Sequence, residues 1–167
     1  MAVLLGLALF SGSLVLQSSL ISHLRLLHGT ADLPLLVLVA WLLHPRLPWP
    51  WAWAVLLGGL VGWVSGLPWF VPVLAYTLVA ALTLMLRWRL WQVSLLVYLF
   101  LVVSGTLLVQ TLTWAALLAL GTSIPWRLAF TQILLPSALL NVLLALPTHG
   151  VVMEITAWAL PEVEEVA

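Results

Sequence analysis

The chain has 167 residues, of which 65% are hydrophobic and 6% are charged, and its formal net charge at pH 7 is zero. A soluble domain carries about 25% charged residues, so this chain is predicted to be an integral membrane protein. The balanced charge, without a basic patch, excludes a nucleic-acid-binding protein, and the lack of cysteine excludes disulfides, thiolate chemistry and sulfur-ligated metals.

The apolar segments are continuous rather than alternating, which favours membrane-spanning helices over the strands of a barrel. Breaks rich in Gly, Pro, Ser or charged residues separate six predicted helices. They cover residues 2–22, 32–44, 51–67, 69–87, 91–119 and 126–147. The predicted fold is therefore an all-α membrane protein, a bundle of six transmembrane helices in one domain over 1–160, followed by an acidic tail over 161–167.

The first predicted helix has no basic residues before its apolar stretch, so we expect a retained span rather than a signal peptide. Its polar residues Ser11, Gln17, Ser18 and Ser22 are expected to bond across helices. The second predicted helix is short. Its apolar core over 33–43 is too short to cross about 30 Å of hydrocarbon, so it is tilted, begins as early as Thr30, or crosses only in part.

The third predicted helix carries a small residue at every fourth position: Ala54, Gly58, Gly62 and Gly66. On a helix these positions form a groove without side chains, which lets another helix approach closely. Two interpretations remain open. The groove either docks a partner protein or packs against another helix of this same chain.

The fifth predicted helix presents one broad polar stripe, formed by Tyr98, Thr106, Gln110 and Thr113. Polar groups at such positions avoid lipid and form hydrogen bonds between helices. The stripe therefore either bonds to neighbouring helices or lines a cavity for a small molecule.

The sixth predicted helix contains Pro136, Ser137 and Asn141 within the run "ILLPSALLNVLLALPTHG". Pro136 frees the carbonyl of residue 132 and is expected to bend the helix. Ser137 and Asn141 are four residues apart, so they share a face, and that face must point at protein because hydrocarbon cannot satisfy an amide. Pro147 is expected to end the helix or bend it again, with 151–160 as an interfacial segment.

No catalytic or metal-binding constellation is predicted. Asp32, the five arginines and the four histidines all fall at predicted span ends or in loops, and the histidines lack ligand-type neighbours at helical spacing. These histidines are His23, His28, His44 and His149. We therefore expect no enzyme, no metal and no cofactor.

The loop arginines and the tryptophans predict the orientation in the membrane. Arg46, Arg87 and Arg89 fall on the side of the N-terminus, against Arg25 and Arg127 on the other, which favours both termini in the cytoplasm. Most tryptophans lie near predicted helix ends, as interfacial anchors do. Three lie deeper and are expected to pack between helices: Trp41, Trp63 and Trp114.

Taken together, these motifs resemble the rod-shape-determining membrane protein family MreD. The resemblance rests on "GTADLPLLVLVAWLL" with Asp32, on the glycine-spaced helix before the Gly66–Pro68 turn, on Arg87 and Arg89, and on "LLPSALLNVLLALP". Two features differ from the family. Many members carry an acidic residue near the end of helix three, where this chain has "GWVSG", and their basic C-terminal end is replaced by "PEVEEVA".

The resemblance implies a fold like that of the S component of energy-coupling-factor transporters, in the bacterial cytoplasmic membrane. It also implies a non-enzymatic scaffold of cell elongation that binds the bitopic protein MreC. Further implied partners are RodA, its penicillin-binding transpeptidase partner and, indirectly, the MreB filament, besides membrane lipids. The alternative is a transporter subunit that binds a vitamin or a metal, although the sparse charge and the lack of an Ala-rich coupling motif count against it.

Overall fold

The computed structural model describes residues 2–19, 25–26, 29–45, 47–89 and 95–159. The long helices are α1 (Ala2–Ser19), α2 (Leu33–Leu42), α3 (Pro50–Val64), α4 (Phe70–Arg89), α5 (Leu95–Ala119) and α7 (Leu135–Ala159). A short helix α6 (Trp126–Leu128) and a π-helical turn η2 (Ala129–Leu134) lead directly into α7. Two short strands, β1 (Arg25–Leu26) and β2 (Gly29–Thr30), pair antiparallel between α1 and α2.

The described chain is predominantly helical, as predicted, but the expected six full spans are not supported. Three helical runs are long and apolar enough to cross a membrane, namely 70–88, 95–119 and 126–158, which indicates a membrane protein. The other three long helices are shorter than the span length. The 10 residues of α2 rise about 15 Å and the 15 residues of α3 about 22 Å, against about 30 Å of hydrocarbon.

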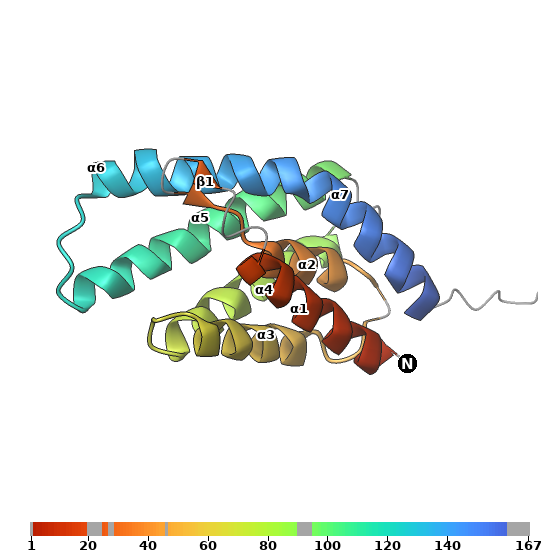
Figure 1. Ribbon diagram of the computed structural model, residues 1–167. Coiled ribbons are helices and arrows are strands. Elements are labelled where there is room, and N and C mark those ends of the chain that lie inside the picture. The colour runs from red at the N-terminus through yellow and green to blue at the C-terminus, as the bar shows by residue number, and fades with distance from the viewer. Residues whose placement is uncertain (1, 20–24, 27–28, 46, 90–94, 160–167) are drawn as a thin grey trace, which may run out of the picture.

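The helices surround α2, which lies at the centre of the molecule (Figure 1). On one side α5 and α7 run next to each other, and on the other side α3 and α4 form a closely packed pair. The N-terminal helix α1 packs across α2. Every residue of α2 is buried, so this helix contacts protein on all faces and is hydrophobic all round, as a buried helix should be.

Several predicted boundaries were wrong. The helix α3 ends at Val64, so Gly66 lies in the following turn and not on the glycine face. The helix α7 continues through Pro147 to Ala159, because a helix in a membrane bundle tolerates a proline whose freed backbone groups find other partners. His149 therefore lies inside a helix and not in a loop. Residues 20–22, residues 91–94 and the acidic tail 161–167 lie outside the described residues.

Proline 136 is accommodated by a local change of helix type. In the π-helical turn before it, the Leu135 N–H donates to the carbonyl of Phe130, five residues earlier. A wide turn of this kind shifts the hydrogen-bond pattern just before a residue that has no N–H to donate.

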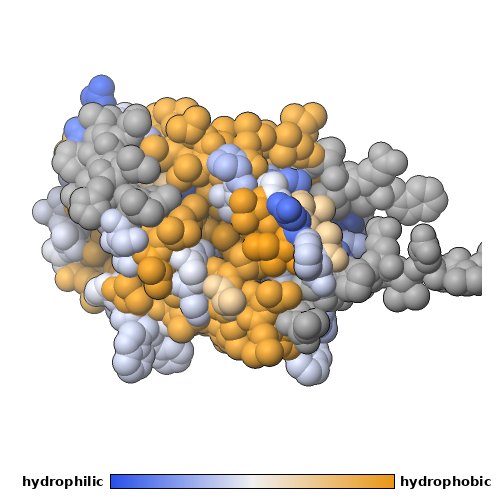
Figure 2. All heavy atoms as spheres, turned by 45° about the vertical axis from the view of Figure 1, so that its right-hand side comes forward, coloured by the Kyte–Doolittle hydropathy of each residue, from blue (hydrophilic) through white to orange (hydrophobic). Residues whose placement is uncertain are grey.

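Much of the surface is apolar, and Figure 2 shows this on one face. Exposed leucines and tryptophans are normal where lipid, and not water, is the solvent. Trp63 was predicted to pack between helices, but it is 91% exposed. By contrast Trp41 is fully buried and makes edge-on ring contacts with Phe10 and Trp53.

Candidate functional site: a polar cluster at the start of the central helix

The amino-terminal end of α2 is packed among α1, α4 and α7, and its backbone donors bond to side chains of the protein. The first N–H groups of any helix lack partners within the helix, and each unsatisfied group in a dry interior costs several kcal/mol. Pro34 removes one donor, because proline has no N–H. The remaining donors each have a partner in the structure.

Asp32 caps the helix. Its Oδ1 accepts a hydrogen bond from the Leu35 N–H at 3.1 Å, and its own carbonyl accepts from Leu36 at 3.2 Å. This is the ordinary role of an aspartate that precedes a helix. The hydroxyl of Tyr76, on α4, donates to the same carboxyl group at 2.8 Å from Oδ1 and 3.0 Å from Oδ2.

Gln17, on α1, satisfies two backbone groups at once. Its amide oxygen accepts from the Leu33 N–H at 3.0 Å, and its amide nitrogen donates to the carbonyl of Ala31. The Gln17 side chain therefore joins α1 to the backbone at the start of α2. The sequence placed Gln17 among polar residues of the first helix but gave no partner for it.

Ser137 and Asn141, on α7, complete the cluster from the opposite side. The Asn141 Oδ1 accepts from the Asp32 N–H at 2.7 Å, and its Nδ2 donates to the Thr106 hydroxyl of α5 at 2.8 Å. The Ser137 Oγ accepts from the Thr30 N–H at 3.1 Å. Both α7 side chains are fully buried, and both point at protein.

The strand β2 lies directly against the backbone of α7 at this point. A Cβ added to Gly29 would lie 2.6 Å from the Ser137 nitrogen and 2.7 Å from the Pro136 Cβ. Only a glycine permits this approach, which brings the Thr30 and Asp32 N–H groups within reach of the α7 side chains. Pro136 is therefore placed at the contact between β2 and α7.

The polar stripe of α5 divides among several surroundings. Thr106 bonds to Asn141, and the Gln110 amide approaches the Ser137 hydroxyl at 3.5 Å. Tyr98 lies farther along α5, where its hydroxyl donates to the carbonyl of Leu36 at 3.3 Å. Thr113 lines a cavity near the cluster. The stripe therefore faces protein. Tyr98, Thr106 and Gln110 bond to neighbouring helices, and Thr113 borders a cavity.

Two small cavities adjoin the cluster, with volumes of about 160 Å³ and 200 Å³. Five residues line both of them: Asp32, Val61, Ser65, Tyr76 and Gln110. The first extends toward Thr113, and the second toward Gln17 and Thr30. The Asp32 carboxyl group therefore borders both cavities.

The glycine face of α3 is occupied within the chain. A Cβ on Gly58 would lie 2.7 Å from the Val73 Cα, and one on Gly62 would lie 3.0 Å from the Trp69 carbonyl oxygen. Ala54 is fully buried. The face lies against the start of α4 and the turn before it, so it is not free to dock a partner. Gly66 has open space around it.

The carboxyl-terminal end of α2 is satisfied by Arg87, on α4. Its Nη1 donates to the carbonyls of Leu42 at 2.8 Å and His44 at 2.9 Å. A cation at a helix carboxyl terminus also interacts favourably with the helix dipole. The central helix is thus held by polar side chains at both ends, from α1, α4 and α7.

Among the described residues, no group of three or more His, Cys, Asp or Glu side chains lies close enough to hold a metal ion. The polar groups around Asp32 donate to and accept from backbone groups or one another. Comparison with protein families, with curated proteins and with solved structures found no match for this chain. The fold and the cluster define a helical membrane protein with a buried polar centre.

Proposed function

We propose that this chain is a non-enzymatic membrane scaffold of the bacterial cell-elongation machinery, similar to MreD. The proposal is supported by the hydrogen bonds that polar side chains form between helices inside the bundle. Gln17, Tyr76, Ser137 and Asn141 come from three helices and bond to one short segment before α2. Side chains used in this way hold helices in fixed positions, which a scaffold requires.

On this proposal the chain lies in the cytoplasmic membrane as a single six-helix domain with both termini in the cytoplasm, and its fold resembles a transporter S component. It binds the transmembrane helix of an MreC-like bitopic protein. It associates through that protein with RodA, its transpeptidase partner and, indirectly, the MreB filament. These partners rest on the sequence resemblance described above.

The outer face of α7 is our proposed contact surface for the partner helix. The glycine face of α3 and the Pro136–Asn141 face are both used within the chain, so a partner needs another surface. Leu139, Leu143 and Leu146 are 64%, 70% and 54% exposed. Their spacing of four and three residues, continued at Gly150, is the spacing by which two helices interlock along a seam.

Cysteine cross-linking tests this proposal cleanly because the chain has no cysteine of its own. Single cysteines at Leu139, Leu143 or Leu146 should form disulfides with cysteines in the transmembrane helix of a co-expressed MreC-like protein. Leu74 and Leu78 are matched controls, since they are 52% and 40% exposed on α4 and should not cross-link. Cross-links at Leu74 or Leu78 alone would place the contact surface on α4 instead of α7. Failure of the two proteins to co-purify and to cross-link at any position would overturn the scaffold.

The second candidate is a subunit that binds a small molecule for transport, and the cavities beside Asp32 favour it. A carboxyl group next to internal space is a candidate ligand contact. The size of the two cavities counts against transport, because each has a volume of about 160–200 Å³, whereas pockets for small molecules have about 300–1,000 Å³.

Native mass spectrometry of the purified chain separates the scaffold from the transport subunit. A stoichiometric small molecule that is lost in Asp32→Asn would support transport and contradict the scaffold.

A further inference from the structure

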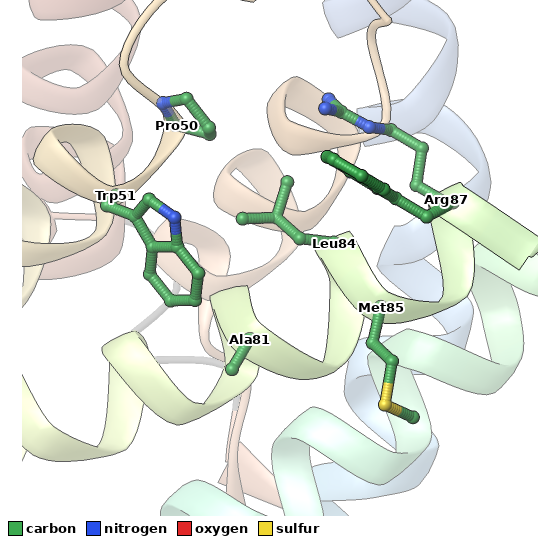
Figure 3. A pocket seen from close by; sticks show the side chains of 7 residues that line it. Pro50, Trp51, Ala81, Leu84, Met85 and Arg87 are labelled. Atoms are coloured by element: carbon green, nitrogen blue, oxygen red, sulfur yellow. The ribbon is translucent and has the colours of Figure 1, made fainter.

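A groove outside the polar cluster lies between the start of α3 and the end of α4. Its volume is about 460 Å³. Figure 3 shows residues from both helices around it, with Pro50 and Trp51 on α3 opposite Leu84 and Arg87 on α4. The remaining lining residues are Ala81, Met85 and Trp88. The lining is apolar apart from the single guanidinium group at one end.

The groove is charged at one end and apolar along the rest, in the same order as the headgroup and acyl chain of a phospholipid. Arg87, Leu84 and Ala81 follow one another at three-residue intervals along α4, so they span about 9 Å of the helix axis. The charged residue stands near the helix end, and the small apolar residue lies six residues earlier on α4. A lipid has the same order, with a charged headgroup at the membrane surface and an acyl chain that extends inward.

Exposed tryptophans place this end of the helices at the level of the headgroups. Trp88 is 84% exposed, and Trp49 and Trp51 are 75% and 50% exposed. Exposed tryptophan side chains of membrane proteins are concentrated at the boundary between lipid and water. Arg87 therefore lies at the depth where phosphate groups are found.

Arg87 has hydrogen-bond donors available for a lipid headgroup besides those that bond to the end of α2. A guanidinium group has five N–H donors, and Nη1 alone supplies the bonds to Leu42 and His44. The donors on Nε and Nη2 make no bond to residues that the structure describes. The α2 carbonyls hold the guanidinium in place, so its remaining fork is oriented in advance for a phosphate.

We propose that this groove binds an anionic phospholipid, with the phosphate on Arg87 and an acyl chain along Ala81, Leu84 and Met85. Charge supports an anionic headgroup over a zwitterionic one. Arg87 is the one charged residue among those that line the groove, and it is a cation. Basic residues next to membrane helices attract anionic lipids.

Native mass spectrometry in detergent tests the site with two probes, phosphatidylglycerol and phosphatidylethanolamine. The wild-type chain should retain phosphatidylglycerol in preference. Arg87→Gln should weaken its retention about fivefold, the effect of one basic residue near an anionic surface. Arg127→Gln, at the other end of the bundle, should leave it unchanged. Equal retention of the two lipids, or equal effects of the two substitutions, would overturn the proposal.

A second variant leaves Arg87 in place, because Arg87 also stabilises α2 and its loss weakens the fold. Ala81→Leu fills the apolar part of the groove and should reduce the retention of phosphatidylglycerol. Ala115→Leu, exposed on α5, is the matched control and should retain it fully. Inorganic phosphate at millimolar concentration should not displace the lipid if the acyl chain is bound. Displacement by phosphate, or no effect of Ala81→Leu, would contradict a lipid site.

Discussion

Replacing Asn141 with leucine tests the account of the polar cluster most sharply, because the two side chains have similar size. The substitution removes the acceptor of the Asp32 N–H, which lies 2.7 Å away, and the donor to Thr106, which lies 2.8 Å away. A buried N–H without an acceptor costs about 1–3 kcal/mol. The lost contact between α5 and α7 adds about 0.6 kcal/mol, the average for hydrogen bonds between membrane helices. We therefore expect a loss of about 2–4 kcal/mol in total.

The assay is reversible unfolding by dodecyl sulfate in mixed micelles, followed by tryptophan fluorescence. Leu143→Ala, on the exposed face of the same helix, is the control and should change the free energy of unfolding far less. A double-mutant cycle with Thr106→Val isolates the side-chain pair and should give a coupling of about 0.6–1.7 kcal/mol. If Asn141→Leu is no more destabilising than the control, the cluster does not hold the start of α2, and the reasoning fails.

Three further substitutions test individual contacts, the first two in the same assay and the third by the yield of folded protein. Gly58→Leu should destabilise by at least about 1–3 kcal/mol because its Cβ would lie 2.7 Å from the α4 backbone, whereas Gly59→Leu, with open space around it, should be nearly neutral; equal effects would refute the close α3–α4 contact. Tyr76→Phe removes two contacts to the Asp32 carboxyl group and should cost about 1.5–3 kcal/mol, so an unchanged stability would show that this bond is absent. Gly29→Ala should lower the yield of folded protein, since its Cβ would lie 2.6 Å from the α7 backbone, and a normal yield would argue against that approach.

Composition was enough to predict a helical membrane protein, because a surface with so little charge cannot face water. Continuous apolar runs located the helices, and the short run over 33–43 indicated that the second helix was unusual. The sequence also required Ser137 and Asn141 to face protein, since amides and hydroxyls are costly in hydrocarbon. It could not name their backbone partners, the N–H groups of Thr30 and Asp32, which lie more than 100 residues away in the chain.

The sequence misplaced features that depend on tertiary contacts. Asp32 was expected only to begin the second helix at a span end, because nothing in the local sequence distinguishes a helix cap exposed to water from one packed inside a bundle. Its partner Tyr76 is a lone tyrosine in an apolar helix, 44 residues away. Arg87 looked like an orientation signal, but it also bonds to the end of α2. Trp63 looked internal because its predicted helix continued to residue 67, whereas α3 ends at Val64 and the indole is exposed beside that helix end.

The complete burial of α2 underlies the whole account, and lipid contact can be measured directly. The chain would be reconstituted in a bilayer that contains a phospholipid with a photoreactive diazirine on its acyl chain, and the labelled peptides mapped by mass spectrometry. Residues 33–42 should carry no label on any face, while the outer face of α7 over 139–146 should be labelled. Label on any face of 33–42 would mean that α2 contacts lipid and would contradict a central helix held inside by its neighbours.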